Sequence, residues 1–382
     1  MKYLIQIFIL ACVFQAFTSR AEDNQLKITG YGSIIAGKTF GTVDDPINLG
    51  KRRDETFTAD FYDVGQYTND INFKAESILA VQGVYTVNSE LSITGQLVAK
   101  GVDDFEPEFD WYYVTYRPND DWTFMAGRRN IPMYYYSEFS EVGYAYPWMR
   151  PPANLYWWQI TQFNGFHAAY NFKLGELSHT VTAFHGDERD EQNKEMEYYE
   201  VLYGNTNVTR VDEFWTNING INWVIAGDFF DVRLVYFTND RDRTKFLDDG
   251  SVEYSLPFSQ RFMGVGGSIN WQAFTLLFDW NHVKYKDVRG TEFPTYLLSL
   301  VYNWGEFQPF IAYSKADHER TAVPTDDLEE HKLWSAGVRW DLYSNVAFKF
   351  QYDHFTDQGY APKQWNYHGD ARVISAGIDF IF

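Results

Sequence analysis

RVISAGIDFIF, the stretch from Arg372 to Phe382, alternates in character with a period of two residues. Such alternation is typical of a β-strand that has one apolar face and one face of small or polar side chains. The apolar face carries Ile374, Ala376, Ile378, Phe380 and Phe382, and the other face carries Val373, Ser375, Gly377, Asp379 and Ile381. A strand of about ten residues with these two faces fits one crossing of a lipid bilayer.

The same rhythm is present from residue 26 onward. Segments of about ten residues are separated by connections that are alternately short and long. We expect sixteen strands, at residues 26–36, 71–87, 90–100, 110–117, 122–129, 165–173, 177–186, 218–226, 230–238, 261–270, 274–284, 295–302, 307–315, 332–340, 346–355 and 372–382. This pattern predicts an all-β fold, a transmembrane antiparallel β-barrel with both chain ends on one side. A soluble β-sandwich is the alternative, but it would need a second sheet along every apolar face.

Composition supports a barrel in the membrane. Aromatic residues make up 19% of the chain, yet the mean hydropathy is −0.40. This combination is expected when strands alternate an aromatic lipid-facing side with a polar lumen side. Beyond the amino-terminal segment, no stretch approaches the roughly 20 consecutive apolar residues of a membrane helix. The formal net charge of −20 argues against nucleic acid and anionic lipid as partners.

The amino-terminal segment predicts export. Lys2 precedes an apolar run over residues 3–17, and Ser19 and Ala21 form a small-x-small cleavage site. We expect cleavage after Ala21, so that residues 1–21 are a signal peptide and residues 22–382 a single barrel domain. The alternative is a lipoprotein signal at Cys12, the only cysteine of the chain. On either interpretation the folded part has no disulfide.

One connection differs from the others: NIPMYYYSEFSEVGYAYPWMRPPANLYWW, residues 130–158. Its prolines prevent regular helix or strand pairing, and its rings require an enclosed surface. We therefore expect this third long loop to fold into the lumen and form the constriction. Its aromatic residues either anchor the loop to the wall or form a slide for saccharides. The residues predicted at the constriction are Arg128, Arg129, Glu138, Glu141, Tyr144, Tyr146, Trp148 and Arg150.

Strand rhythm, the order of the long loops, the export signal and the terminal Phe382 together resemble the general porins of the Gram-negative outer membrane. The resemblance implies a homotrimer in contact with outer-membrane lipid and lipopolysaccharide, whose third extracellular loop folds inward. It also implies that Phe382 is part of the signal recognised by the barrel assembly machinery. Residues 130–158 do not match the acidic eyelet motif of enterobacterial porins, so the resemblance leaves ion selectivity open.

Basic residues are predicted on the lumen wall when the most apolar face of each strand is turned outward. They are Lys74, Lys100, Arg117, Arg129, Arg233, Arg339 and Lys349. The same face receives the acids Glu76, Asp279, Asp353 and Asp379. In an aqueous pore we expect these charges to be hydrated and to create a transverse field against the acids of the third loop. The alternative is that they are only hydrated interior groups or form salt bridges between the wall and the loop.

These features predict a channel for passive diffusion of small hydrophilic solutes and ions, with no cofactor and no metal. Alternatives are a substrate-selective channel for saccharides or organic acids, and a plugged barrel that binds partners at the surface. Catalysis has little support, because the histidines form no HExxH pattern and no Gly-x-Ser-x-Gly elbow is present. A barrel lipase with serine and histidine on its outer wall is the enzymatic alternative.

Overall fold

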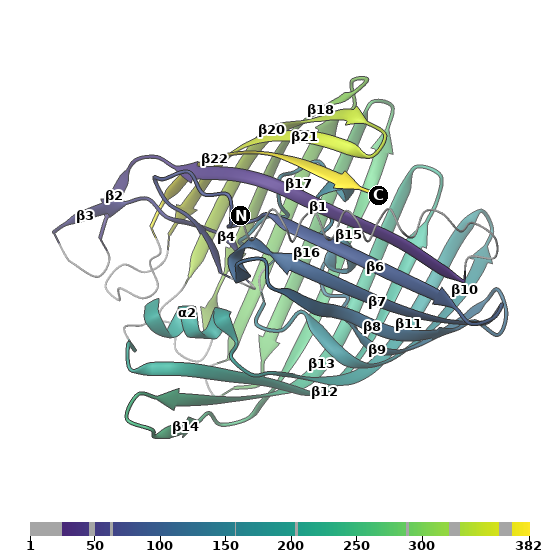
Figure 1. The fold of residues 1–382 in the computed structure, drawn as a ribbon, viewed down its shortest axis with the longest axis horizontal. Coiled ribbons are helices and arrows are strands. Elements are labelled where there is room, and N and C mark those ends of the chain that lie inside the picture. The colour runs from purple at the N-terminus through teal and green to yellow at the C-terminus, as the bar shows by residue number, and fades with distance from the viewer. Residues whose placement is uncertain are drawn as a thin grey trace, which may run out of the picture.

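A strand ladder that closes on itself forms the body of the protein. The computed structural model describes residues 25–45, 50–61, 64–156, 158–202, 205–287, 290–320, 329–358 and 369–382. Within these residues sixteen long strands form a closed antiparallel barrel, which confirms the predicted fold class (Figure 1). The strands are β1 (Leu26–Thr39), β6 (Ile78–Thr86), β7 (Leu91–Lys100), β8 (Pro107–Tyr116), β9 (Trp122–Asn130), β10 (Gln162–Leu174), β11 (Leu177–Asp190), β12 (Val208–Ala226), β13 (Phe230–Leu247), β15 (Phe258–Trp271), β16 (Phe274–Tyr285), β17 (Thr291–Tyr302), β18 (Phe307–Asp317), β20 (Glu330–Tyr343), β21 (Val346–Asp357) and β22 (Ala371–Ile381).

The first strand closes the barrel. Residues 31–39 of β1 pair with β22, and residues 26–33 pair with β6 on the other side. Beyond the end of β22, the backbone N–H of Phe382 donates to the carbonyl of Gly30 at 3.0 Å, and the N–H of Gly30 donates to Phe382 at 2.9 Å. Ladder pairing continues around the described strands, as hydrocarbon requires of backbone polar groups.

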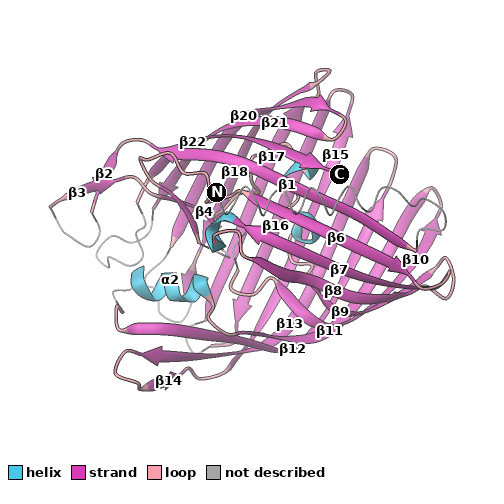
Figure 2. Cartoon of the chain, in the orientation of Figure 1, coloured by secondary structure: helices cyan, strands magenta, loops and turns pink. Residues whose placement is uncertain are grey.

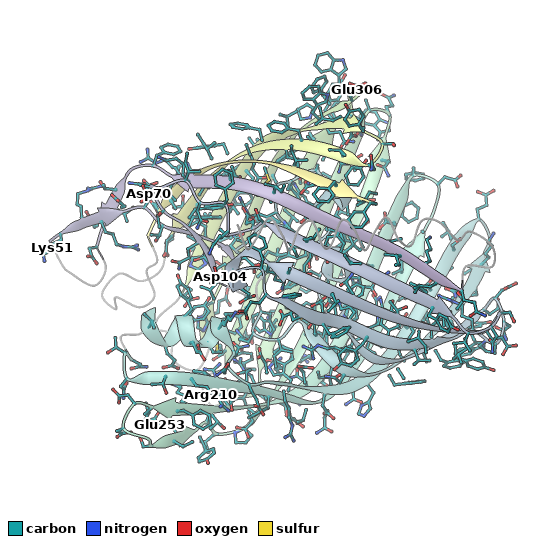
Figure 3. All side chains as sticks on the ribbon, viewed as in Figure 1. Lys51, Asp70, Asp104, Arg210, Glu253 and Glu306 are labelled. Atoms are coloured by element: carbon teal, nitrogen blue, oxygen red, sulfur yellow. The ribbon has the colours of Figure 1, made fainter. Side chains whose placement is uncertain are left out.

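The two faces of the strands differ as the alternation predicts. In β22, Ile374 and Ile378 are exposed on the outer face, whereas Val373, Ser375 and Asp379 are buried inside. Aromatic residues gather near the short turns, as in Trp122 and Tyr170, whose ring centroids are 4.8 Å apart. These rings form the interfacial girdle of a membrane barrel. Figure 3 shows the side chains on the ribbon, with labelled Lys51 and Glu306 toward opposite ends.

The long connections contain structure that the sequence did not reveal. The first holds two hairpins, β2 (Thr42–Asp44) with β3 (Arg52–Asp54), and β4 (Phe57–Asp60) with β5 (Gly65–Tyr67). The expected strand at 71–87 was too long, since β6 begins at Ile78. The expected loop at 187–217 instead contains the end of β11, helix α2 (Lys194–Leu202) and the start of β12. The remaining short pieces are β14 (Val252–Tyr254) and β19 (Glu319–Arg320).

These long connections gather at one end of the barrel. Figure 1 shows the β2–β3 hairpin, α2 and β14 together there, and Figure 2 shows α2 with short helical turns among the strands. Short turns and the carboxyl end lie at the other end, which is the periplasmic side in barrels of this kind. No helix among the described residues is long and apolar enough to cross a membrane. The predicted signal peptide at 1–21 lies outside the described residues.

The contact between Phe382 and Gly30 leads to a prediction about assembly. A side chain at Gly30 would meet the Phe382 ring, so glycine permits this ring to cover the closing strand. We expect Phe382→Ala to reduce the amount of heat-modifiable, folded barrel in the outer membrane several-fold while leaving export intact. Semi-native electrophoresis of outer-membrane fractions measures this amount. Leu256→Ala, at an exposed residue, is the matched control. A Phe382→Ala variant that folds at the parental level would contradict the prediction.

Candidate functional site

The third loop, of which residues 131–156 and 158–161 are described, lies inside the barrel and crosses to the opposite wall. The indole N–H of Trp148 donates to Ser299 of β17 at 3.0 Å, and the backbone N–H of Met149 donates to Gln351 of β21 at 2.7 Å. The loop also reaches the periplasmic end, where the Tyr144 hydroxyl donates to the carbonyl of Ser344 at 2.9 Å. The loop therefore extends through the lumen toward its periplasmic end.

Wall cations bind the backbone of this loop. The guanidinium of Arg233 donates to the Tyr134 carbonyl at 2.5 Å, and that of Arg339 donates to the Tyr144 carbonyl at 2.5 Å. Lys349 donates to the carbonyls of Gly143 and Trp148 at 2.5 and 2.6 Å. These carbonyls belong to a loop without a ladder, so the cations supply hydrogen-bond donors that water would otherwise provide.

Lys349 also forms a buried ion pair behind the loop. Its ammonium lies 2.9 Å from the carboxylate of Asp379 on β22. A side chain at Gly143 would collide with this carboxylate and with Ser33 of β1. Glycine at 143 therefore lets the loop backbone approach the wall closely enough for the ammonium to bind both partners.

Arg150 forms a second buried charged anchor of the loop. Its guanidinium pairs with Glu76, which precedes β6, and with Asp353 of β21, and it donates to the Ser375 hydroxyl at 3.0 Å. Burial alone would lower the pKa of Arg150, but the two carboxylates outweigh burial and raise the pKa above its ordinary value. The guanidinium is therefore always charged, and its partners compensate for the lost hydration.

The aromatic residues of the loop form a dry core. Tyr136, Tyr146 and Trp148 are each at most 6% exposed, and the rings of Tyr136 and Trp148 meet edge to face with centroids 5.5 Å apart. Burial raises the pKa of Tyr146 well above its usual range. These rings contact one another and the wall, which supports their role as anchors. Because they are buried, these three rings offer no free face to a permeating saccharide. Trp157 lies outside the described residues.

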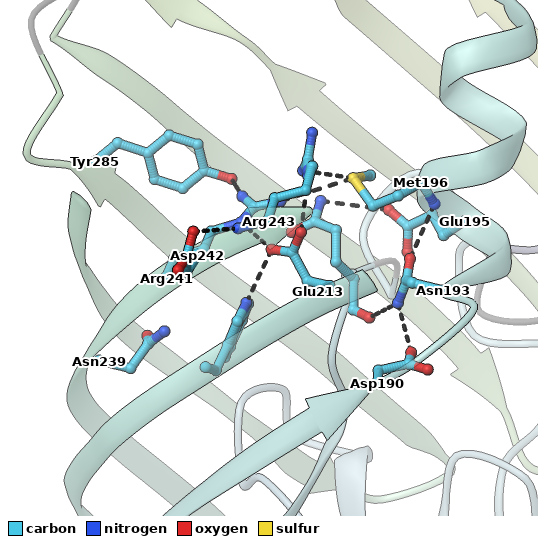
Figure 4. Close-up of polar contacts among 12 residues, drawn as sticks. Asp190, Asn193, Glu195, Met196, Glu213, Asn239, Arg241, Asp242, Arg243 and Tyr285 are labelled. Atoms are coloured by element: carbon cyan, nitrogen blue, oxygen red, sulfur yellow. Dashed lines mark hydrogen bonds and ion pairs between the residues drawn. The ribbon is translucent and has the colours of Figure 1, made fainter. Parts of the chain in front are cut away.

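Two other connections cover the extracellular side of the third loop. Phe57 and Tyr67 of the first loop lie under the guanidinium of Arg150, with ring centroids 5.6 and 5.7 Å from it. Helix α2 lies over a second charged cluster, drawn in Figure 4, in which Glu213 of β12 pairs with Arg241 and Arg243 of β13. The first loop and α2 thus add protein to the lumen beside Arg150 and beside Glu213.

Open space remains on the other side, next to β6 to β11 and β1. A cavity of about 300 Å³ lies near the extracellular loops, and its lining includes Asp103, Asp110 and Arg128. A second cavity of about 590 Å³ lies near the periplasmic turns, and its lining includes Tyr31, Trp111 and Phe382. Both cavities are lined by Asn130, Ser140 and Glu141. We name the two cavities with this shared zone the passage.

Opposite charges meet at the lining that the two cavities share. The Lys100 ammonium of β7 lies 2.7 Å from the Glu141 carboxylate of the loop, and the Tyr31 hydroxyl donates to the same carboxylate at 3.2 Å. Nearby, Arg129 of β9 lies 3.1 Å from Glu138. The charges of the wall and of the loop are therefore close enough to create the expected transverse field, although they are already paired.

The structure separates the predicted constriction residues into two groups. Arg128, Arg129, Glu138 and Glu141 lie beside the passage, with Arg128 paired to Glu188 at 2.6 Å. The others contact the interior of the loop, the first loop or the wall: Tyr144, Tyr146, Trp148 and Arg150. Tyr146 and Arg150 also line a small cavity of about 100 Å³ beneath the first loop.

The predicted wall cations are also divided. Lys100 lies on the passage, but Arg233, Arg339 and Lys349 are buried against the third loop, so the expectation that they are hydrated was wrong. Lys74 precedes β6 and pairs with Asp104 at the exposed surface, and Arg117 follows β8 at a short turn. These two residues are not part of the lumen wall.

Sequence reasoning missed several lining residues. Gln82 and Gln96 follow the inward alternation of β6 and β7, so the parity rule would have included them had neutral side chains been considered. Asp110 could not be placed this way. A register shift between β7 and β8 at Gln96 and Leu97 brings both Asp110 and Trp111 to the inner face, which strict alternation forbids.

Comparison with known proteins decides the family. The model of the Gram-negative porin family matches residues 162–360, which include β10 to β21. The chain belongs to the Gram-negative porin family. This porin is therefore an outer-membrane protein, and its family and fold are those of a diffusion channel rather than of an enzyme. A search of curated proteins found no significant match.

Solved structures agree with this fold over almost the whole chain. The porin resembles outer-membrane expressed OmpT of Vibrio cholerae with a TM-score of 0.59 and 11% identity, covering 94% of this chain and 99% of that one. It also resembles the outer-membrane channel DcaP of Acinetobacter baumannii, with a TM-score of 0.57, 10% identity, and 94% and 97% coverage. For the anion-selective porin of Comamonas acidovorans the values are 0.52, 12%, and 94% and 99%. Identities this low establish the fold alone.

The Arg150 cluster of the porin gives a stability prediction. Arg150→Met leaves the carboxylates of Glu76 and Asp353 buried without their cation, which costs roughly 3–5 kcal/mol in comparable buried pairs. We expect the free energy of unfolding in guanidinium chloride to fall by about that amount. The exposed pair of Arg52 with Asp44 provides the control, since Arg52→Met should change stability by less than about 1 kcal/mol. Equal stability of the Arg150→Met and Arg52→Met variants would contradict this assignment.

Glu195 of α2 gives a pH prediction. Its side chain is 1% exposed, Gln159 donates to Oε1 at 3.3 Å, and burial raises the pKa of Glu195 well above its usual range. A carboxyl whose folded-state pKa is raised stabilises the fold at low pH and loses this contribution as pH rises toward the folded-state pKa. We expect α2 to become more accessible to protease as pH rises, and Glu195→Gln to reduce this pH dependence. Glu253→Gln, at an exposed residue, should behave as the parent does.

Proposed function

We propose that the passage carries small hydrophilic solutes and ions by passive diffusion, without cofactor or turnover. The observation that supports this most strongly is the continuity of lining: the extracellular and periplasmic cavities share Asn130, Ser140 and Glu141. Their walls carry the charged and amide side chains that hydrate a permeating solute. We also propose that the channel contains no metal and catalyses no reaction. Residues 1–21 are removed on export.

The third loop limits the route because it lies inside the lumen. The third loop lies against β16, β17, β21 and β22, and the pair of Lys100 with Glu141 crosses the remaining space. Solutes therefore pass between the loop and the wall formed by β6 to β9. If the Lys100–Glu141 pair does not open, the loop inside the lumen favours the second candidate. This candidate is a plugged barrel that binds partners at the surface.

Assembly in the membrane is also proposed. Strand pairing between β1 and β22 is complete within one chain, so each barrel is a separate channel. One similar solved structure, OmpT of Vibrio cholerae, is described in a trimer form. We infer a homotrimer of this chain in outer-membrane lipid and lipopolysaccharide, delivered by the barrel assembly machinery through its carboxyl-terminal strand.

Reconstitution distinguishes the two functions. Purified, folded protein is added to a planar lipid bilayer in potassium chloride, and current is recorded at constant voltage. A diffusion channel gives stepwise conductance increments of uniform size. Insertion of folded barrels without any conductance would contradict the channel and support the plugged barrel.

Shortening the third loop tests where the size limit lies. Removal of residues 134–148 deletes the carbonyls bound by Arg233, Arg339 and Lys349 together with most of the loop core. We expect single-channel conductance to rise several-fold and larger uncharged solutes to enter in liposome swelling. Removal of residues 248–251, an exposed turn between β13 and β14, is the control and should leave both unchanged. Parental conductance in the shortened variant would mean that the constriction lies elsewhere.

A further inference from the structure

The periplasmic cavity of the passage has an unusual lining for a channel of hydrophilic solutes. Its volume of about 590 Å³ falls within the range of small-molecule sites, roughly 300–1,000 Å³. We name it the aromatic chamber and define it by Tyr31, Gln96, Trp111, Glu138, Phe139 and Glu141. Phe139 belongs to the third loop and Trp111 to β8, so aromatic rings from both the loop and the wall line the chamber.

The charges that face this chamber are carboxylates. Glu138 and Glu141 are part of its lining, whereas their partners Arg129 and Lys100 are not. The side chain of Glu138 is 45% exposed, while that of Arg129 is 13% exposed. The Arg129 guanidinium is turned to the rings of Trp111 and Tyr113, 5.6 and 4.9 Å from their centroids. Each carboxylate is paired with a wall cation, but only the carboxylates line the chamber together with the aromatic rings.

The extracellular cavity favours the same sign of charge. Its lining contains more acidic than basic side chains, namely Asp103, Glu108, Asp110, Glu141, Glu188, Asp190 and Glu191 against Lys100, Arg128 and Lys194. An excess of one charge in a cleft with low-dielectric walls raises the local concentration of counter-ions. Cations are therefore concentrated before they reach the zone shared by the two cavities.

We propose that the aromatic chamber binds small organic cations that carry an aromatic body, such as arylalkyl primary amines. The ammonium pairs with Glu138 and Glu141, and the ring lies between Trp111 and Phe139. Aromatic faces add attraction for the cation, which a neutral or anionic analogue of the same shape lacks. This inference rests on the proposed function for access to the chamber and names a solute class for it.

Phenylethylamine is the probe, with 2-phenylethanol as its neutral analogue and phenylacetate as its anionic analogue. Each is added to the periplasmic side of single channels in a planar bilayer, and block of the potassium current is measured. We expect concentration-dependent block by the amine at concentrations at least tenfold lower than those at which either analogue acts. Glu138→Gln combined with Glu141→Gln should remove this difference. Glu306→Gln, at an exposed short turn, is the matched control and should preserve it.

Titration calorimetry of the folded protein in detergent measures the same preference without conductance. Preferential binding of the amine, lost in the double variant and kept in Glu306→Gln, supports the chamber. Equal binding of amine and alcohol, or no binding of either, overturns the proposal. Because potassium conductance is recorded in the same bilayer without any probe, failure of the chamber is distinguishable from failure of the channel.

Discussion

Complete pairing of backbone polar groups is the constraint on which this structure depends. Hydrocarbon offers no hydrogen bonds, so a sheet in the membrane has to end where it begins. Here β1 meets this constraint by pairing with β22 over one half and with β6 over the other. Once the wall is closed, every inward position faces an enclosed space, and the content of that space decides what the barrel does.

The third loop faces the same problem of backbone polarity without a ladder of its own. Its carbonyls are satisfied by Arg233, Arg339 and Lys349, and its aromatic side chains exclude water from the remaining contacts. The charges of the wall therefore act mainly as fixed donors for the backbone, and only a subset acts on solutes. The passage lies where the wall cations Lys100 and Arg129 pair with carboxylates of the loop and do not bind its backbone carbonyls.

The wall was predictable because period-two alternation is a local property of each strand. The inward third loop was also predictable from its prolines and rings, since an enclosed surface was their only compatible surroundings. The group that each wall cation contacts was not predictable. Whether Lys349 faces water or Gly143 depends on how a loop two hundred residues away in the chain folds. Asp110 shows a second limit, because the register shift beside it carries no signature in the residues themselves.

The anchors of the third loop have an uneven distribution along the chain. Arg339, Lys349 and Asp353 lie on β20 and β21, and Ser375 lies on β22, whereas the loop itself follows β9. The loop therefore cannot be seated until the carboxyl-terminal strands that hold its anchors are in place. A chain truncated before β20 would carry the aromatic segment without these anchors.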